Sequence, residues 1–504
     1  MFDHRASSSA AIARLDDYFE RRHPSATAES AALLDRIRTA GRAENQAAAA
    51  QLAAIGQLFV HRLSRCSDTE DWAVDTEEAV ATEVAAALRI SQAMAASRLR
   101  YARAMRERLP SVGEVFAAGD LDFRTFRTIV FRTDLITDPD VLATVDNGLA
   151  LGVGRWPSMT QARLAGQIDK IVARADGDAV RRRQQRHADR ELSIWDSGEG
   201  LAEVFGRLMS ADAHAVDARL DALAATVCPD DPRTRTQRRA DAMGAVASGA
   251  ERLACRCGRN DCSAAGRTAP AAVVVHVIAE HATLDGTAAT PGSLVSADGL
   301  IPAELIAELA RTAKLVPLIH PADAPPEPRY TPSQALADFV RCRDLTCRWP
   351  GCDRPATKCD LDHTVAYADG GPTHASNLKC LCRLHHLVKT FWGWRDQQLP
   401  DGTVILTSPS GQTYVTTPGS ALLFPSLCVP TGDLRAPETH PPPDSCGDRA
   451  AMMPKRRGTR AYDRAHRVSA ERRRNHLART ARRSESLSHL GPAPPEANDD
   501  PPPF

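Results

Sequence analysis

The 504-residue sequence lacks any window of about 18 apolar residues, the length that a membrane-spanning helix needs. Its first residues, MFDHRASSSAAIARLDDYFERR, also lack the basic segment and the unbroken apolar stretch of a secretion signal. These absences argue against a membrane protein and predict a cytoplasmic one. Thiols stay reduced in that compartment, so clusters among the 13 cysteines indicate metal sites or buried thiols before disulfides.

The chain also lacks net charge, because 63 Lys and Arg balance 63 Asp and Glu. Its charge is unevenly distributed: from Lys455 to Arg483, twelve basic side chains stand against only Asp463 and Glu471. This basic tail has a local excess of ten positive charges on a mildly acidic body. We expect it to add sequence-independent affinity for DNA, although a charged run in a disordered tail is often merely solvated.

Apolar residues recur at helical spacing from about Leu33 to Leu63 and from Asp75 to Arg108. After a flexible N-terminus, residues 1–30, the sequence therefore predicts a mainly α domain with a small β-sheet at 31–320. Its β part includes a hairpin formed by ELSIW and LAEVFGRL. A helix at Ala211 to Ala225 follows this hairpin, and a buried strand is expected within the β-branched run that ends at Ile278.

The segment EVAAALRIS followed by SRLRYARAM is similar to the helix-turn-helix recognition unit of sigma-factor-like regulators. Ser91 suits the N-cap of the second helix, which carries Arg98 and Arg103 as candidate DNA contacts. The turn lacks the usual glycine, and an arginine-rich helix more often presents a solvated face. DNA contact and packing within a helical bundle therefore both stay open.

The second half of the chain reads as a series of smaller segments separated by proline-rich and glycine-rich turns. Turns containing Gly402 and Gly411 predict three short strands after Trp392. The predicted divisions are a linker and lead-in helix at 321–340, a metal-bearing module at 341–394, a β meander at 395–428, and a disordered, Arg/Pro-rich tail at 429–504. Within this tail, a transient helix is expected at Ala461 to Arg483.

Residues 347–394 contain the densest group of chemically active side chains, CRWPGCDRPATKCDLDHTVAYADGGPTHASNLKCLCRLHHLVKTFWGW. Thiolate and imidazole are preferred zinc ligands, and two ligand pairs here have suitable spacing for one tetrahedral structural Zn²⁺. The predicted ligands are Cys347, Cys352, Cys382 and His385. Cys342 or Cys380 could replace one of these cysteines, whereas Cys359 is expected in the core.

Between the two ligand pairs stand Asp362 and His363, then Asn377, and His386 follows them. This order resembles the HNH endonuclease family, which implies a ββα-metal fold around one divalent cation. By that resemblance His363 is the general base, the amide of Asn377 holds the His363 loop, and Asp362 and His386 bind the catalytic metal. In zinc-bearing members of the family the second ligand pair is C-x-x-C, whereas in this chain it is Cys382-x-x-His385. This difference leaves open an exchange of roles between the adjacent residues His385 and His386. They point about 100° apart on a helix and cannot both serve one ion comfortably.

This constellation suits hydrolysis of phosphodiesters. A neutral imidazole can take a proton from water, and a cation can neutralise charge on the phosphorane and on the leaving 3′ oxygen. An oxygen ligand with one imidazole suits Mg²⁺ or Mn²⁺. Lys389 and Arg383 are candidate contacts to nucleic acid, with a solvated helix end as the alternative for Lys389.

The flanking segments RTAKLVPLIHPADAPPEPRYTPSQALADFVRCRDLTCRWPGC and FWGWRDQQLPDGTVILTSPSGQTYVTTPGSALLFP extend the likeness. They resemble the actinobacterial 13E12 repeat family, in which a helical domain of unknown function 222 precedes an HNH module. The resemblance covers roughly residues 30–428. It implies a zinc-containing nuclease module behind a mainly helical domain, and it assigns no target.

A second cysteine group, CRCGRNDC, holds three potential ligands of a further structural metal, Cys255, Cys257 and Cys262. The fourth ligand is open among Cys228, Asp261 and His276, and an unligated loop is the alternative.

The residues together predict a metal-dependent endonuclease that acts on DNA and has neither a membrane partner nor a small-molecule substrate. The rival hypothesis is a DNA-binding protein that keeps its structural zinc and has lost catalysis. Cleavage of RNA or branched DNA by the same residues is a further alternative. The target, the strand preference and the oligomeric state have no signal in the sequence.

Overall fold

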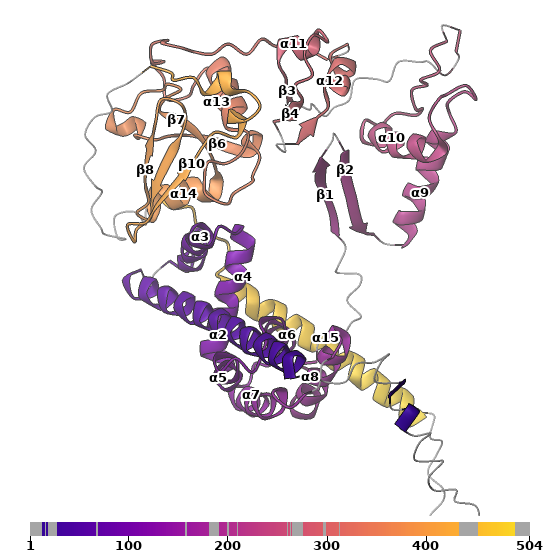
Figure 1. The fold of residues 1–504 in the computed structure, drawn as a ribbon, viewed down its shortest axis with the longest axis vertical. Helices are drawn as coiled ribbons and strands as arrows, with labels where there is room; N and C mark the ends of the chain where they lie inside the picture. Colours follow the sequence, from indigo (N-terminus) through magenta and orange to yellow (C-terminus); the bar gives the residue numbers. More distant parts are fainter. Residues whose placement is uncertain are drawn as a thin grey trace, which may run out of the picture. The chain divides into compact units, whose positions relative to one another are not determined.

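The protein is described here in a computed structural model, in which helix predominates and the strands form small antiparallel sheets (Figure 1). This agrees with the mainly α character expected from the sequence. The chain divides into two compact units, each described below by itself. The residues that the structure describes are 13–15, 17–18, 28–66, 69–156, 159–180, 191–198, 201–208, 210–259, 261–262, 264, 276–295, 299–311, 313–432 and 452–488.

Unit 1 contains residues 1–67, 96–181 and 458–504, and it is helical throughout its described part. Asp122 and Thr160 cap two of its helices by accepting hydrogen bonds from backbone N–H groups of the first turn. Phe116 and Phe126 stack in its core with ring centroids 4.9 Å apart. Its helical elements are α2 (Ala28–Arg65), the greater part of α4 (Gln92–Arg103), the π-helical turn η1 (Ala104–Arg108), α5 (Pro110–Ala117), α6 (Phe123–Thr133), α7 (Pro139–Val153), α8 (Gln161–Ala175) and α15 (Arg460–Ser488).

Helix α15 covers the segment where the sequence predicts a transient helix within a largely disordered tail, and it is packed against other parts of unit 1. Val468 is buried, and Asn475 donates hydrogen bonds from Nδ2 to the carbonyl oxygens of Asp178, at 2.9 Å, and Val180, at 3.0 Å. Arginines of the helix form ion pairs with Asp176 and Asp178. The basic run therefore finds acidic partners about 300 residues earlier in the chain, and its contribution to DNA affinity stays a prediction.

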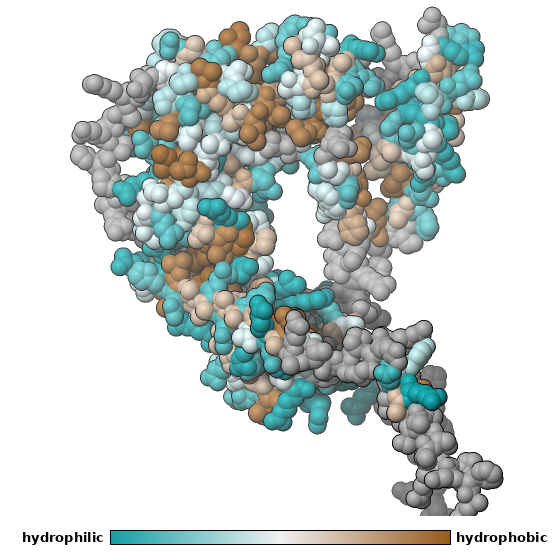
Figure 2. Space-filling view, in the orientation of Figure 1, coloured by the Kyte–Doolittle hydropathy of each residue, from teal (hydrophilic) through white to brown (hydrophobic). Residues whose placement is uncertain are grey.

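Unit 2 contains residues 68–95 and 182–457. The predicted hairpin is present as an antiparallel pair of strands, and the predicted helix follows it. The hairpin leaves apolar side chains exposed, among them Ile194 and Phe205, and hydrophobic atoms gather over it in Figure 2. The elements that precede residue 320 are α3 (Thr76–Leu88), β1 (Glu191–Gly198), β2 (Leu201–Arg207), α9 (Ser210–Ala224), α10 (Arg235–Ala247), β3 (Val277–Ile278), α11 (His281–Leu284), β4 (Gly292–Leu294), β5 (Leu300–Ile301) and α12 (Ala303–Ala310).

The strand expected in the β-branched run is short in the described structure. Strand β3 covers only Val277–Ile278 and pairs with β4, while residues 271–275 lie outside the described residues. The predicted helix–turn–helix boundaries agree with α3 and α4: Arg89 adopts a left-handed conformation after α3, and Ser91 accepts from the N–H of Met94 at the start of α4. A DNA contact by α4 stays a prediction.

The rest of unit 2 is built around a hydrophobic core that includes Trp349, Phe339 and Leu378. A β-hairpin, β6 and β7, leads into helix α14, and the predicted three-stranded meander follows in the order β10-β9-β8. Its turns use Gly402 and Gly411 at positive φ, as expected. The elements are α13 (Gln334–Asp344), η2 (Ala356–Lys358), β6 (Cys359–His363), η3 (Tyr367–Asp369), β7 (Leu378–Cys382), α14 (Arg383–Phe391), β8 (Arg395–Gln398), β9 (Val404–Thr407), β10 (Thr413–Thr416), η4 (Gly419–Ala421) and η5 (Pro425–Cys428).

The two units do not follow the predicted division into a helical domain at 31–320 and later modules. Residues 68–95 belong to unit 2 because Trp72 packs edge-on against Trp392, whose Nε1 donates to the carbonyl of Val74 at 3.1 Å. The predicted linker is also partly packed, since the N–H of Glu327 donates to the carbonyl of Thr373 at 2.9 Å. None of the described helices combines the length and hydropathy needed to cross a bilayer.

Candidate active site and metal centres

Four predicted zinc ligands, Cys347, Cys352, Cys382 and His385, converge in unit 2, with their ligand atoms all within 4.8 Å of one another. The Nδ1 atom of His385 lies 3.4 Å from Cys347 Sγ and 3.3 Å from Cys382 Sγ. Hydrogen bonds from the neighbouring thiols of Cys347 and Cys352 lower the pKa of Cys382, which favours the thiolate that a metal needs. The buried ring of Trp349 stacks on His385 at 4.8 Å and fixes its orientation. The cluster could hold a metal ion such as zinc.

The alternative ligands lie outside this cluster. Cys380 points into the core beside Asp344, whose carboxylate accepts from the Cys380 N–H at 2.8 Å, and burial raises the pKa of its thiol. Burial also raises the pKa of Cys342, to about 12. Cys359 is buried with its thiol 3.3 Å from the carbonyl of Pro355, as expected for a core residue.

Eleven described cysteines are free thiols. Cys66 is disulfide-bonded and departs from the expectation that the cysteines stay reduced.

The β6–β7 hairpin and helix α14 bring Asp362 and His386 together. Strand pairing sets Asp362 of β6 opposite Lys379 of β7, and α14 returns across the hairpin to present His386. The His386 Nε2 atom lies 3.4 Å from Asp362 Oδ1. The other ring nitrogen, Nδ1, lies 2.9 Å from Oδ2 of Asp360, which shares a face of β6 with Asp362.

Two carboxylates and one imidazole lie together on this side of β6. His386 lies between the two carboxylates, with Nδ1 facing Asp360 and Nε2 facing Asp362. Adjacent octahedral ligands, each about 2.1 Å from Mg²⁺, stand about 3 Å apart, close to the separation found. A carboxylate behind a ligating imidazole is also the usual means of orienting it.

Two lysines and a second carboxylate surround Asp362. Lys379 Nζ lies 2.6 Å from Asp362 Oδ2 and 2.5 Å from Asp396 Oδ2, and Lys389 Nζ lies 2.7 Å from the same Asp362 oxygen. Burial would raise the pKa of Asp362, but the positive charges of Lys379 and Lys389 beside it hold that pKa well below its ordinary value. Asp362 is therefore ionised at neutral pH.

Lys389 is not the solvated helix end considered from the sequence. Its ammonium is largely buried and also donates to the carbonyl of His363 at 2.5 Å. A contact with phosphate stays a prediction for this side chain.

His363 ends β6, and its ring is held on two sides. Its Nε2 lies 3.0 Å from Thr373 Oγ1, and the ring of Tyr330 stacks on it at 5.2 Å. The Thr373 hydroxyl also lies 3.4 Å from the carbonyl of Tyr330, and when it donates there its oxygen accepts from His363 Nε2. Nδ1 is then the basic nitrogen of the neutral ring. Burial lowers the pKa of His363, which favours that neutral form.

Asn377 ties together the two ends of the loop after His363. Its Oδ1 accepts from the N–H of Val365 at 2.9 Å, and its Nδ2 donates to the carbonyls of Val365, at 3.1 Å, and Pro372, at 2.8 Å. Gly371 allows the tight return, since a Cβ there would lie 1.9 Å from the Val365 oxygen. These bonds close the loop that follows His363, while a part for Asn377 in catalysis stays a prediction.

The predicted nucleic-acid contacts have different surroundings. Arg383 is exposed at the start of α14, 3.5 Å from Asp360. In unit 1, Arg98 hydrogen-bonds to Gln51, and Arg103 forms an ion pair with Glu107 at 3.1 Å. The contacts of Arg98 and Arg103 favour packing within the helical unit, while DNA binding by them stays untested.

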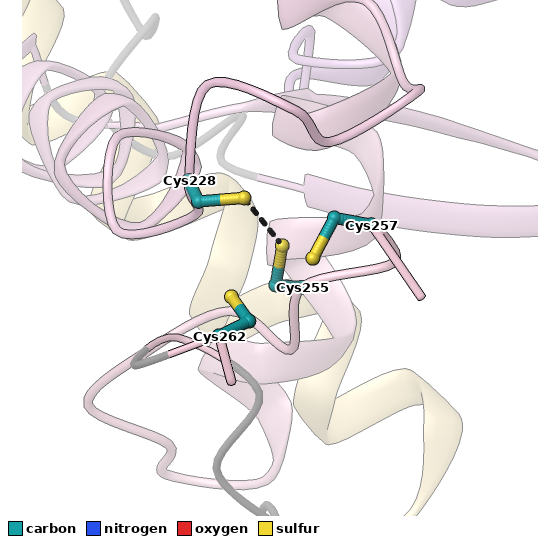
Figure 3. Close-up of side chains that lie close together, drawn as sticks. All are labelled: Cys228, Cys255, Cys257 and Cys262. Atoms are coloured by element: carbon teal, nitrogen blue, oxygen red, sulfur yellow. Dashed lines mark hydrogen bonds between the residues drawn. The ribbon is translucent and has the colours of Figure 1, made fainter. Parts of the chain in front are cut away.

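The second cysteine group is also assembled: Cys255, Cys257 and Cys262 meet Cys228, whereas Asp261 and His276 are not part of the cluster (Figure 3).

Sequence reasoning missed five side chains of the candidate active site. Asp360 and Lys379 could have been found from strand alternation and pairing, because both share a sheet face with Asp362. The remaining three, Tyr330, Thr373 and Asp396, come from distant segments and leave no local signal.

Comparison with known proteins assigns the chain to a family. The family described as Domain of unknown function (DUF222) matches residues 39–344, which is more than half of the chain. The chain is 44% identical over 472 residues to the Uncharacterized protein Rv3776 of Mycobacterium tuberculosis, covering 88% of this chain and 90% of that relative. It is 42% identical over 486 residues to the Uncharacterized protein Rv2100 of the same organism, covering 88% of each. The protein therefore belongs to the DUF222 family. No solved structure gives a significant match.

Proposed function

We propose that this protein is a metal-dependent endonuclease of the HNH type that hydrolyses phosphodiester bonds of DNA. The observation that carries the proposal is the β6–β7–α14 arrangement, which gathers Asp362, His363, Asn377 and His386 beside a zinc-binding cluster. The order of these residues along the chain is the one that the HNH family uses. Membership of the DUF222 family is compatible with the 13E12 resemblance, although the matched segment ends before Cys347.

Asp362 Oδ1 and His386 Nε2 would hold one Mg²⁺ or Mn²⁺. The bound cation would supply charge neutralisation at the scissile phosphate and at the leaving 3′ oxygen. Asp360 orients His386 for this role, and the two lysines keep Asp362 ionised. With only two protein ligands, most coordination positions are left for phosphate and water.

His363 serves as the general base through Nδ1. Thr373 Oγ1 accepts a hydrogen bond from the Nε2–H group of His363, and Tyr330 covers one face of the ring. The imidazole therefore presents its basic nitrogen in a fixed orientation. Asn377 keeps the following loop closed, which fixes the end of β6 where His363 stands. Proton abstraction by a positioned base typically contributes about 10²- to 10⁴-fold in rate.

Supercoiled plasmid provides the test. Purified protein should nick or linearise the plasmid in Mg²⁺ or Mn²⁺. This cleavage should stop when EDTA is present. The new ends should carry 5′-phosphate and 3′-hydroxyl groups, because the 3′ oxygen is the leaving group. Cleavage in EDTA, or ends with a 3′-phosphate, would contradict the assigned chemistry.

The second candidate is a DNA-binding protein that keeps its structural zinc without catalysis. The internal ion pairs of Lys389 with Asp362 and Asp396 favour it, because they occupy groups beside the candidate metal position. Binding of plasmid without cleavage in either metal would support this candidate over the nuclease. RNA and branched DNA should be assayed beside the plasmid, since the same residues could cut either.

A further inference from the structure

A second group of thiols in unit 2 is arranged around one point. Cys228 follows helix α9, while Cys255, Cys257 and Cys262 stand in a loop after α10, here called the knuckle loop (residues 255–259 and 261–262). Figure 3 shows the four side chains turned toward one another. Their sulfurs all lie within 4.8 Å of each other, although 27 residues separate Cys228 from Cys255.

The spacing of the sulfurs suits a tetrahedral ion. Four thiolates about 2.3 Å from Zn²⁺ have sulfurs about 3.8 Å apart. Cys228 Sγ and Cys255 Sγ are 3.5 Å apart, much farther than the roughly 2.05 Å of a disulfide. All four are free thiols of intermediate burial. The set therefore matches a closed, four-sulfur structural zinc site in number, ligand type and distance.

Backbone N–H groups point at three of the four sulfurs. N–H groups two residues further along the chain, those of Asp230, Cys257 and Arg259, face the sulfurs of Cys228, Cys255 and Cys257, respectively. Gly258 adopts a φ of +73°, which lets the chain turn immediately after Cys257. Backbone amides directed at sulfur lower the cost of holding several negative charges together.

An independent network holds the knuckle loop against the segment that carries Cys228. Asp231 is buried and pairs with Arg233 at 2.7 Å, and the N–H of Arg256 donates to the same carboxylate at 2.9 Å. Arg233 also donates to the carbonyl of Ala254 at 2.7 Å. These bonds bring Cys255 and Cys257 to Cys228 without any contribution from the sulfurs.

The hydrophobic core at this place is small. Among the described residues, its buried members are Leu223, Ala242, Ala245 and Leu253, with a few partly buried neighbours. A core of this size gains much from a metal that joins its segments, because small structural units rarely fold on apolar burial alone.

We infer that Cys228, Cys255, Cys257 and Cys262 bind a second structural Zn²⁺, which fastens the knuckle loop to the α9–α10 pair. Each thiol releases its proton on binding, and the ion takes no part in hydrolysis. The full-length protein therefore binds two zinc ions, one at each cysteine cluster, whether or not it is a nuclease.

Zinc content per chain tests this inference. Full-length wild type should hold about two zinc ions after dialysis against metal-free buffer. Cys257→Ser should lose one, and Cys257→Ser combined with Cys352→Ser should lose both. Cys428→Ser is the matched control, because this free thiol lies outside both clusters, and it should keep both ions. A Cys257→Ser protein that keeps wild-type zinc, or a wild type with only one zinc that Cys352→Ser removes, would overturn the inference.

A second measurement decides the question if Cys257→Ser does not fold. Iodoacetamide labelling of wild type, read by mass spectrometry, should spare all four thiols until a chelator strips the zinc. Trypsin should likewise cut at Arg256 and Arg259 much faster after chelation. Immediate labelling of Cys228 and Cys257 in zinc-loaded wild type, or a disulfide between any two of the four, would contradict the site.

Discussion

Replacing Thr373 with valine tests the geometry proposed for the general base. Valine keeps the shape of the buried side chain but removes the oxygen that accepts from His363 Nε2. A buried N–H left without a partner costs about 1–3 kcal/mol. That cost falls on the tautomer with basic Nδ1, so the reactive form should become about 5- to 150-fold less populated.

The expected result is a loss of kcat in that range with little change in KM, because Thr373 is a positioning residue that contacts no substrate in this mechanism. The assay is the cleavage rate of supercoiled plasmid over a range of DNA concentrations in Mg²⁺. Thr373→Ser is the matched control, since it keeps the hydroxyl, and it should retain most of the wild-type rate.

Zinc content and melting temperature separate this effect from misfolding. If Thr373→Val folds with full zinc and cleaves at the wild-type rate, the hydrogen bond does not control the His363 tautomer. The assignment of Nδ1 as the base would then fail.

Three further predictions concern the metal cluster, helix α15 and the pH profile. Cys352→Ser should release one zinc and expose residues 347–394 to protease, and retention of both zinc and protection would show that the ligands were misassigned. Asn475→Ala should destabilise unit 1 by about 0.5–1.5 kcal/mol in urea unfolding, because two partly buried carbonyls lose their donor; an unchanged midpoint would contradict the packing of α15. Burial lowers the pKa of His363 below its ordinary 6.5, and the base works in its neutral form, so cleavage should be full at neutral pH and fall on acidification with a midpoint below 6.5. An acidic limb centred above that value would argue against His363.

The parts of the site that sequence could predict are those encoded by short spacing. Cys382 and His385 lie one helical turn apart, and Cys347 and Cys352 flank a glycine turn, so each pair converges locally. The β1–β2 hairpin and the turns at Gly402 and Gly411 were predictable for the same reason, because turn residues and alternation act over a few positions.

The parts that could not be predicted depend on contacts between distant segments. Tyr330 reaches His363 from the predicted linker, and Cys228 joins a loop that begins 27 residues later. Helix α15 is held by aspartates about 300 residues away, so its composition alone indicated no more than a transient helix. A local pattern contains no information on which remote side chain completes a site, which is why the fourth ligand of the second cluster stayed open.

The measurement that tests the central claim most directly is the single-turnover cleavage rate of His363→Ala on supercoiled plasmid in Mg²⁺, compared with wild type at equal zinc content and equal DNA affinity. His281→Ala, which changes an exposed histidine of unit 2 outside both clusters, is the matched control. The account predicts a rate about 10²- to 10⁴-fold lower for His363→Ala and an unchanged rate for the control. A correctly folded His363→Ala protein that cuts as fast as wild type would show that hydrolysis, if it occurs, does not use this site.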